Sequence, residues 1–128
     1  MLCAIAMMAC GSAKQSVTLD DLAGEWKIEQ VAGNPVNAEN EAFLGFDVQE
    51  NRLYGNAGCN SVMGGLQSKE PGKLVFESVA STKRMCADMA TEDAILQAMG
   101  NVKAFDLQGE ALMLTDAEGN VLMQLKKK

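Results

Sequence analysis

Apolar and polar residues alternate along short segments of this chain, and this alternation constrains the fold more than any other feature. Successive side chains of a β-strand point to opposite faces, so period-two alternation predicts strands with one face in a core. Turn-forming residues separate the segments, for example at residues 33–35 and 70–72. The segments expected to be strands are residues 25–31, 43–48, 52–56, 60–67, 73–79, 102–107, 111–115 and 121–125.

The spacing of apolar residues changes between the fifth and sixth of these segments. Ile95, Leu96 and Met99 recur at helical spacing, which predicts one helix. Thr91 is expected to cap the start of this helix, and Gly100 stands where a C-cap belongs. The sequence therefore predicts one helix between strands five and six.

The connections between the predicted strands are short, which implies antiparallel pairing. A single sheet of eight strands tends to curl or close, because closure removes exposed edges. Gly64 and Gly65 in the fourth segment predict a bulge or bend. The predicted fold is therefore mainly β, a strongly curved antiparallel sheet or small eight-stranded barrel, with the helix packed on it or plugging one end.

The chain contains no histidine, and this excludes several kinds of site. Ser-His-Asp and Cys-His catalysis need imidazole as a base near neutral pH, and histidine is the commonest ligand of zinc and copper. The formal net charge of −6 repels phosphate backbones, so nucleic acid is not an expected partner. We therefore expect a protein that is not an enzyme and needs no cofactor. The lysines at residues 126–128 are expected to form a solvated tail.

The first nine residues are uncharged and mostly apolar, and Ala9 immediately precedes Cys10. This arrangement is typical of a bacterial lipoprotein signal, in which the leader is removed and the Cys10 thiol carries diacylglycerol. Met7 stands where such signals usually have leucine, and the positively charged start is missing. The alternatives are a leader cut elsewhere without lipidation and a structural first segment.

The predicted domain organisation follows from this leader. Residues 1–16 are expected to be a signal remnant and tether, and residues 17–128 a single domain. The leader is too short for a transmembrane helix, which needs about 20 apolar residues. The expected location is the cell envelope, where the lipid on Cys10 anchors the chain in a membrane, the outer membrane in the leading interpretation. The domain would then face the periplasm or the cell surface.

Several different short motifs follow one another along the domain. They are Leu22-x-Gly24-x-Trp26, Gly55-x-x-Gly58-Cys59-Asn60, Gly64, Leu74-x-Phe76, Ser81-Thr82-Lys83-Arg84-Met85-Cys86, Glu92 and Leu112-x-Leu114. In this order the chain resembles the META/HslJ domain family over about residues 19–125. The resemblance implies a curved β-sheet or barrel with a helix, an envelope location and a link to stress response or virulence. It implies no established enzyme activity.

The motif residues are interpreted as structural. Trp26 alternates with Ile28 and is expected to be buried as an anchor of the core. Gly58 and Asn60 are expected in a tight turn in which the asparagine bonds to nearby backbone. Gly24, Gly64 and Thr82 are taken as further structural positions of the motif.

Cys59 and Cys86 are predicted to form a disulfide. Removal of the leader takes away Cys3 and lipidation occupies Cys10, which leaves these two thiols. Export would place them in an oxidising compartment, where paired cysteines persist as bridges. The competing interpretation is a pair of free thiols that are redox-active or bind a metal.

The leading functional interpretation is a non-catalytic envelope domain that binds or supports another envelope protein. One alternative is a carrier of a lipophilic ligand, which would need a roomy apolar barrel interior. The other is a carrier of Cu(I), because thiolate and thioether ligands suit this ion. The residues that would supply such ligands are Cys59, Met63, Met85, Cys86 and Met89.

Overall fold

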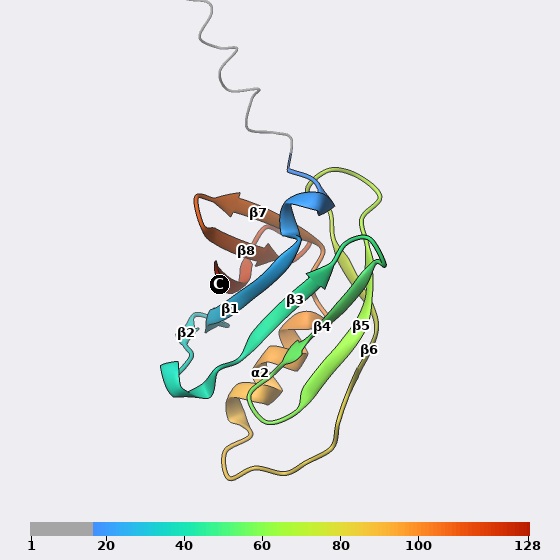
Figure 1. The fold of residues 1–128 in the computed structure, drawn as a ribbon. Coiled ribbons are helices and arrows are strands. Elements are labelled where there is room, and N and C mark those ends of the chain that lie inside the picture. Colours follow the sequence, from blue (N-terminus) through green and yellow to red (C-terminus); the bar gives the residue numbers. More distant parts are fainter. Residues whose placement is uncertain (1–16) are drawn as a thin grey trace, which may run out of the picture.

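The structure, a computed structural model, describes residues 17–128 (Figure 1). Predictions that concern residues 1–16, including lipidation of Cys10, lie outside the described residues. The strands are β1 (Gly24–Val31), β2 (Asn34–Pro35), β3 (Phe43–Asp47), β4 (Arg52–Asn56), β5 (Ser61–Gln67), β6 (Val75–Ser81), β7 (Ala104–Gln108), β8 (Ala111–Thr115) and β9 (Val121–Lys127). The helices are η1 (Leu19–Leu22), η2 (Ala38–Asn40) and α2 (Ala90–Met99).

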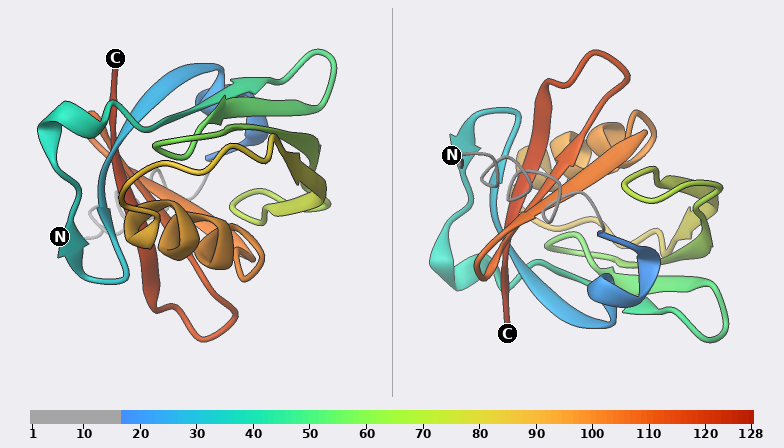
Figure 2. Two further views of the ribbon diagram at one scale, coloured as in Figure 1. Left: turned by 90° about the horizontal axis from the view of Figure 1, so that it is seen from below. Right: turned by 90° about the horizontal axis from the view of Figure 1, so that it is seen from above.

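The strands form one antiparallel sheet that curls strongly into a half-barrel (Figure 2). Its order is β6-β5-β4-β3-β1-β9-β8-β7, and β2 pairs with β1 beside this path. The curved antiparallel sheet predicted from the sequence is therefore confirmed. The two-residue strand β2 was not predicted, so α2 lies between the sixth and seventh strands rather than between strands five and six.

The two edge strands of the sheet, β6 and β7, approach each other at one end. There Lys73 pairs with Ala104 in an isolated bridge, and the Leu74 N–H donates to the Lys103 carbonyl oxygen at 3.1 Å. This seam joins the edges of the half-barrel at that end.

The pairing of β5 with β6 is irregular in the middle. Its register shifts between Met63 and Gly65, which places a bulge where the glycine pair predicts one. On the β6 side Ser78 has a φ of 52°, in the left-handed region. A Cβ atom on Gly64 would lie 3.0 Å from the Glu77 carbonyl oxygen, so the two strands approach closely at this glycine.

Helix α2 lies across the open side of the curved sheet and packs against β1 and β9 (Figure 2). Its core-facing side chains Ile95, Ala98 and Met99 are buried. Gly100 is the C-cap, as predicted, but the helix begins at Ala90, one residue before the predicted cap Thr91. Among the described residues no helix is both long enough and apolar enough to cross a membrane.

The inward side chains of the strands fill the space enclosed by the sheet and α2. Trp26 is 3% exposed, and its indole N–H donates to the Leu22 carbonyl oxygen at 2.9 Å. The expectation that Trp26 anchors the core agrees with this burial. The largest side chains with under 2% exposure, apart from Phe46, are Leu22, Ile28, Leu44, Leu53, Leu74, Ile95, Met99, Leu112, Leu114, Met123 and Leu125.

The lysines at residues 126–128 are exposed to solvent, as predicted, but they do not form a tail. The strand β9 continues to Lys127, opposite Trp26 of β1. The Lys127 ammonium lies 4.8 Å from the centre of the Trp26 ring, and Lys128 forms an ion pair with Glu25 at 3.2 Å. Long lysine stems can lie along apolar surface while the charge stays in water, which explains how the lysines extend a strand.

Candidate functional site

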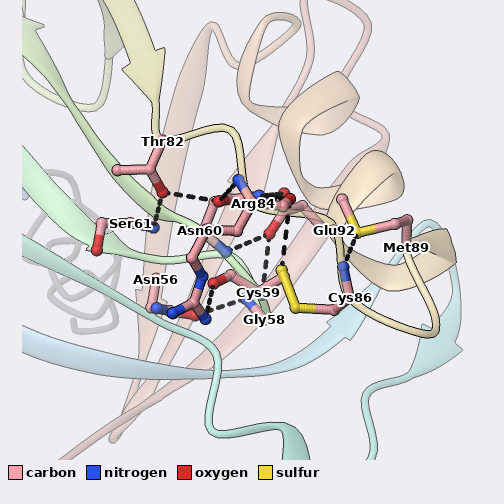
Figure 3. The surroundings of a disulfide bond; sticks show 10 residues. All are labelled: Asn56, Gly58, Cys59, Asn60, Ser61, Thr82, Arg84, Cys86, Met89 and Glu92. Carbon is pink, nitrogen blue, oxygen red and sulfur yellow. Dashed lines mark hydrogen bonds between the residues drawn. A yellow bond between two sulfur atoms is a disulfide. The ribbon is translucent and has the colours of Figure 1, made fainter.

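The two cysteine-containing motifs meet at one end of the half-barrel (Figure 3). Cys59 lies in the turn between β4 and β5, and Cys86 lies in the irregular segment between β6 and α2. A disulfide joins them, with the two Cα atoms 6.0 Å apart. The group of residues around this bond is called the clasp here: it comprises Cys59, Asn60, Thr82, Arg84, Cys86 and Glu92.

The turn that carries Cys59 depends on Gly58. Its φ is +121°, a region that side chains with a Cβ atom rarely adopt. The Gly58 N–H donates to the side-chain oxygen of Asn56 at 2.7 Å, and the Ala57 N–H donates to the Asn60 carbonyl oxygen at 3.0 Å. The tight turn expected from the sequence is present, but the Asn60 side chain bonds to Thr82, Arg84 and Glu92 rather than to the backbone of the turn.

Asn60 is the centre of the clasp and is 2% exposed. Its side-chain oxygen accepts from the Thr82 hydroxyl at 2.7 Å and from the Arg84 N–H at 2.6 Å. Its side-chain amide donates to the Arg84 carbonyl oxygen at 3.0 Å and to Glu92 Oε2 at 2.6 Å. These bonds use both donors and both acceptor positions of the amide, so the side chain has one fixed orientation.

Glu92 is a buried carboxylate in the first turn of α2, and it is 3% exposed. Besides the bond from the Asn60 side chain, its Oε1 accepts the N–H groups of Cys59 at 2.9 Å and Asn60 at 2.7 Å. Burial acts to raise the pKa of Glu92, but the hydrogen bonds from Asn60 and Cys59 and the charge of Arg84 outweigh it and lower the pKa. The group is therefore a carboxylate at neutral pH.

Thr82 and Arg84 complete the attachment of the segment before α2. The Thr82 N–H donates to the Ser61 carbonyl oxygen, and the Ser61 N–H donates to the Thr82 hydroxyl oxygen, each at 3.1 Å. The guanidinium of Arg84 donates to the Cys59 carbonyl oxygen at 3.0 Å. Cys59 Sγ lies 3.6 Å from the Arg84 carbonyl oxygen, a contact rather than a hydrogen bond because a disulfide sulfur carries no proton.

Comparison with known proteins assigns the family. The sequence profile of the META domain matches residues 17–128. This chain belongs to the META domain family. No match was found among curated proteins.

Solved structures share the fold of this META domain. A protein from Burkholderia xenovorans solved by NMR is similar with a TM-score of 0.68 and 20% identity, over 86% of each chain. A second NMR structure gives 0.67 and 23% identity, over 86% of this chain and 94% of the other. A duf4847 family protein from Bacteroides vulgatus ATCC 8482 gives 0.60 and 12% identity, over 84% of this chain and 94% of the other. At these identities the likeness concerns the fold.

The two thiolates of the soft-ligand set proposed for Cu(I) are not free in the structure of this META domain. The sulfurs of Cys59 and Cys86 are bonded to each other. Met63 is 47% exposed on β5, and Met85 is 82% exposed in the segment before α2. Residues 17–128 also contain no group of three or more Cys, Asp or Glu side chains placed to hold a metal ion.

The sequence did not reveal the role of Glu92 or Arg84. A carboxylate beside Asp93 at the start of a helix is typical of a solvated surface position, but Glu92 is buried, whereas Asp93 is exposed. The partner Asn60 lies 32 residues earlier in the chain, so no local pattern joins them. The one sequence signal for Glu92 and Arg84 was that both belong to the motifs that resemble the META domain family.

Proposed function

We propose that this META domain belongs to an exported, lipid-anchored envelope protein and acts without catalysis, by binding another envelope protein. The segment Thr82–Met89 is the proposed contact surface. The binding role rests on one observation: this segment is exposed, and yet the hydrogen bonds of the clasp hold it in place. A rigid exposed loop binds at low entropic cost, because it is already ordered before the partner arrives.

The exposure of this segment supports a role in contact rather than in packing. Residues 82–88 are all exposed, and Met85 is exposed over 82% of its surface. The clasp nevertheless fixes this segment at Thr82, Arg84 and Cys86. Since the side chains add nothing to the core, presentation to a partner is the use that fits the fixed geometry.

The position of the segment suits an anchored protein. The chain enters the described domain just before η1, at the top of Figure 1, and the segment that leads into α2 lies at the opposite end. A lipid on Cys10 would therefore leave the segment pointing away from the membrane. The disulfide supports export, because such bonds persist in oxidising compartments.

The lipophilic carrier is the weaker alternative. The space inside the curved sheet is occupied by core side chains, which leaves the surface clefts as the places for a ligand. One such cleft, of about 410 Å³, is lined by Lys27, Glu41, Ala42, Phe43 and Lys128. Two lysines and a glutamate do not suit a lipophilic guest.

Two experiments test the proposal. Intact-mass measurement of the protein from the membrane fraction should show a chain that starts at a lipid-modified Cys10, and a soluble product or one that retains Met1 would contradict export with lipidation. Capture from envelope extract should then give a defined partner that Met85→Asp abolishes. The matched control is Met63→Asp, which changes an exposed methionine on β5 and should leave capture unchanged. Equal loss with both variants would count against the Thr82–Met89 surface.

A further inference from the structure

The two cysteines of the clasp differ in their exposure to solvent. Cys86 is exposed, whereas Cys59 is 5% exposed beneath the segment that carries Cys86. Thiol–disulfide exchange proceeds by attack of a thiolate on one sulfur, and access decides which sulfur is attacked. An incoming thiol therefore reaches Cys86, and Cys59 is the sulfur that leaves.

The clasp holds both flanks of Cys86 without using the disulfide. Two residues before it, the backbone N–H and carbonyl of Arg84 are bonded to the Asn60 side chain at 2.6 and 3.0 Å. Six residues after it, Glu92 is bonded to the N–H groups of Cys59 and Asn60. Neither attachment involves a sulfur atom, so breaking the S–S bond leaves both in place.

The charges near Cys59 oppose each other and do not decide the direction of exchange. The Arg84 guanidinium, bonded to the Cys59 carbonyl oxygen, favours a thiolate on Cys59. The Glu92 carboxylate, bonded to the Cys59 N–H, disfavours it. Access and the fixed geometry are therefore the features that direct attack to Cys86.

We propose that Cys86 is a site of reversible S-thiolation by small thiols such as glutathione. While Cys86 is modified, the clasp stays closed: the hydrogen bonds that Asn60 and Glu92 make within it persist. The small thiolate attacks Cys86 Sγ and forms a new S–S bond, while the bond to Cys59 breaks. The electron pair stays on Cys59 Sγ, which takes a proton from water. In the reverse step the Cys59 thiolate attacks Cys86 and expels the small thiol, so no further oxidant or reductant is needed. This inference goes beyond the proposed function and does not depend on it.

The test uses the full oxidised chain with glutathione under native conditions, followed by acid quenching and trypsin digestion. Cleavage after Arg52 and Arg84 places Cys59 and Cys86 on separate peptides. The glutathione adduct on Cys86 should exceed that on Cys59 by at least about tenfold, because the buried sulfur is not attacked. Equal labelling, or labelling that needs denaturant, would overturn the proposal.

A second measurement tests whether the clasp stays closed. Amide hydrogen exchange at Cys59, Asn60 and Arg84 should be the same in the oxidised and the thiolated protein, since their N–H groups are bonded to Glu92 or Asn60. Faster exchange at these amides after thiolation would show that the disulfide was holding the segment, and would overturn the claim. This readout uses the unaltered protein, so it does not depend on a variant that folds.

A variant separates the clasp from the rest of the fold. In Asn60→Ala the thiolated form should lose amide protection at Arg84, because the acceptor of that N–H is removed. The matched control is Asn120→Ala, which removes a hydrogen bond to Asp116 in another turn and should leave the Arg84 amide protected. Protection that persists in thiolated Asn60→Ala would refute the role of the clasp.

Discussion

The side-chain amide of Asn60 donates to the carboxylate of Glu92 at 2.6 Å, although 32 residues separate the two in the chain. Both side chains are buried, at 2% and 3% exposure, and they are the polar side chains found buried in residues 17–128. The bond connects the turn between β4 and β5 with the first turn of α2. The helix is thus fixed to the sheet by a polar contact at its N-terminal end and by apolar packing along the rest of its buried face.

Glu92→Gln is expected to lower the free energy of unfolding by about 2–3 kcal/mol, because it leaves buried donors unpaired. The new amide would set one NH₂ group against the Asn60 amide, which Thr82 and Arg84 prevent from turning over. Urea unfolding measures the change. Asp93→Asn, at the exposed neighbouring position, should change stability by less than about 0.5 kcal/mol. A similar small effect of Glu92→Gln would contradict the account of the clasp.

The lowered pKa of Glu92 predicts how stability depends on pH. A carboxyl group whose folded pKa lies below its unfolded value stabilises the fold in its ionised form. Its contribution is complete above the ordinary value of 4.5 and is lost as the pH falls through the lowered folded pKa. Urea unfolding between pH 7 and pH 3 should therefore show a loss of stability that is reduced in Glu92→Gln.

Asp116 provides the comparison for this pH series. Hydrogen bonds from the side chain and backbone of Asn120 lower the pKa of Asp116, so this exposed loop also contributes to acid sensitivity in the same direction. Asp116→Asn should reduce the acid-induced loss of stability less than Glu92→Gln does, because solvent screens an exposed group. If Asp116→Asn and Glu92→Gln reduced this loss equally, the burial of Glu92 would not increase its contribution to acid sensitivity.

Trp26→Ala is expected to destabilise the domain by about 3–5 kcal/mol, the usual cost of deleting a large buried aromatic side chain. Trp26 is 3% exposed and also loses its hydrogen bond to the Leu22 carbonyl oxygen. Tyr54→Ala, at a side chain that is 39% exposed, is the matched control and should cost clearly less. A loss under about 1 kcal/mol for Trp26→Ala would mean that the indole does not anchor the core.

The disulfide is expected to stabilise the domain by about 3–4 kcal/mol, because it closes a long loop in the unfolded chain. The two cysteines are separated by 27 positions in the sequence. The double variant Cys59→Ser with Cys86→Ser should unfold at lower urea concentration and should still fold, since the core and the hydrogen bonds from Asn60 to Arg84 and Glu92 remain. Thiol titration of the unreduced, unfolded wild-type domain should detect neither cysteine; two reactive thiols would refute the bond.

Gly58→Ala is expected to destabilise the domain more than Gly119→Ala. Both glycines have positive φ, +121° and +89°, so both substitutions carry backbone strain. A Cβ on Gly58 would also lie 2.8 Å from Asn40 Oδ1, whereas a Cβ on Gly119 would meet nothing within 4 Å. Thermal unfolding of Gly119→Ala measures the effect of backbone strain alone, and thermal unfolding of Gly58→Ala measures backbone strain together with the Asn40 contact. Equal shifts in melting temperature would show that the Asn40 contact costs nothing.

Local patterns account for the parts of the fold that the sequence predicted. Alternation identified the strands because one face of each strand is buried, and the spacing of Ile95 and Met99 identified α2 because the helix has one buried face. The N-cap of α2 is Met89, two residues before the predicted cap Thr91. Asp88 accepts the Ala90 N–H at 2.9 Å, and this contact fixes the boundary that a capping threonine was expected to set.

Contacts between distant residues account for what the sequence did not predict. The clasp depends on hydrogen bonds between segments that pack together only in the folded chain, such as Asn60 with Arg84 and Glu92. The strand β2 was missed for a different reason. Asn34 and Pro35 are turn-forming residues, so the sequence predicted no strand there. At the edge of β1, however, a two-residue pairing tolerates proline.

The bulge between β5 and β6 has a consequence for self-association. β6 is an edge strand, and a straight edge offers its free backbone groups to a strand of another molecule. The register shift at Met63 and Gly65 and the left-handed Ser78 bend this edge, so it cannot serve as a regular template. Copies of the domain at high local concentration would therefore resist stacking strand to strand into aggregates.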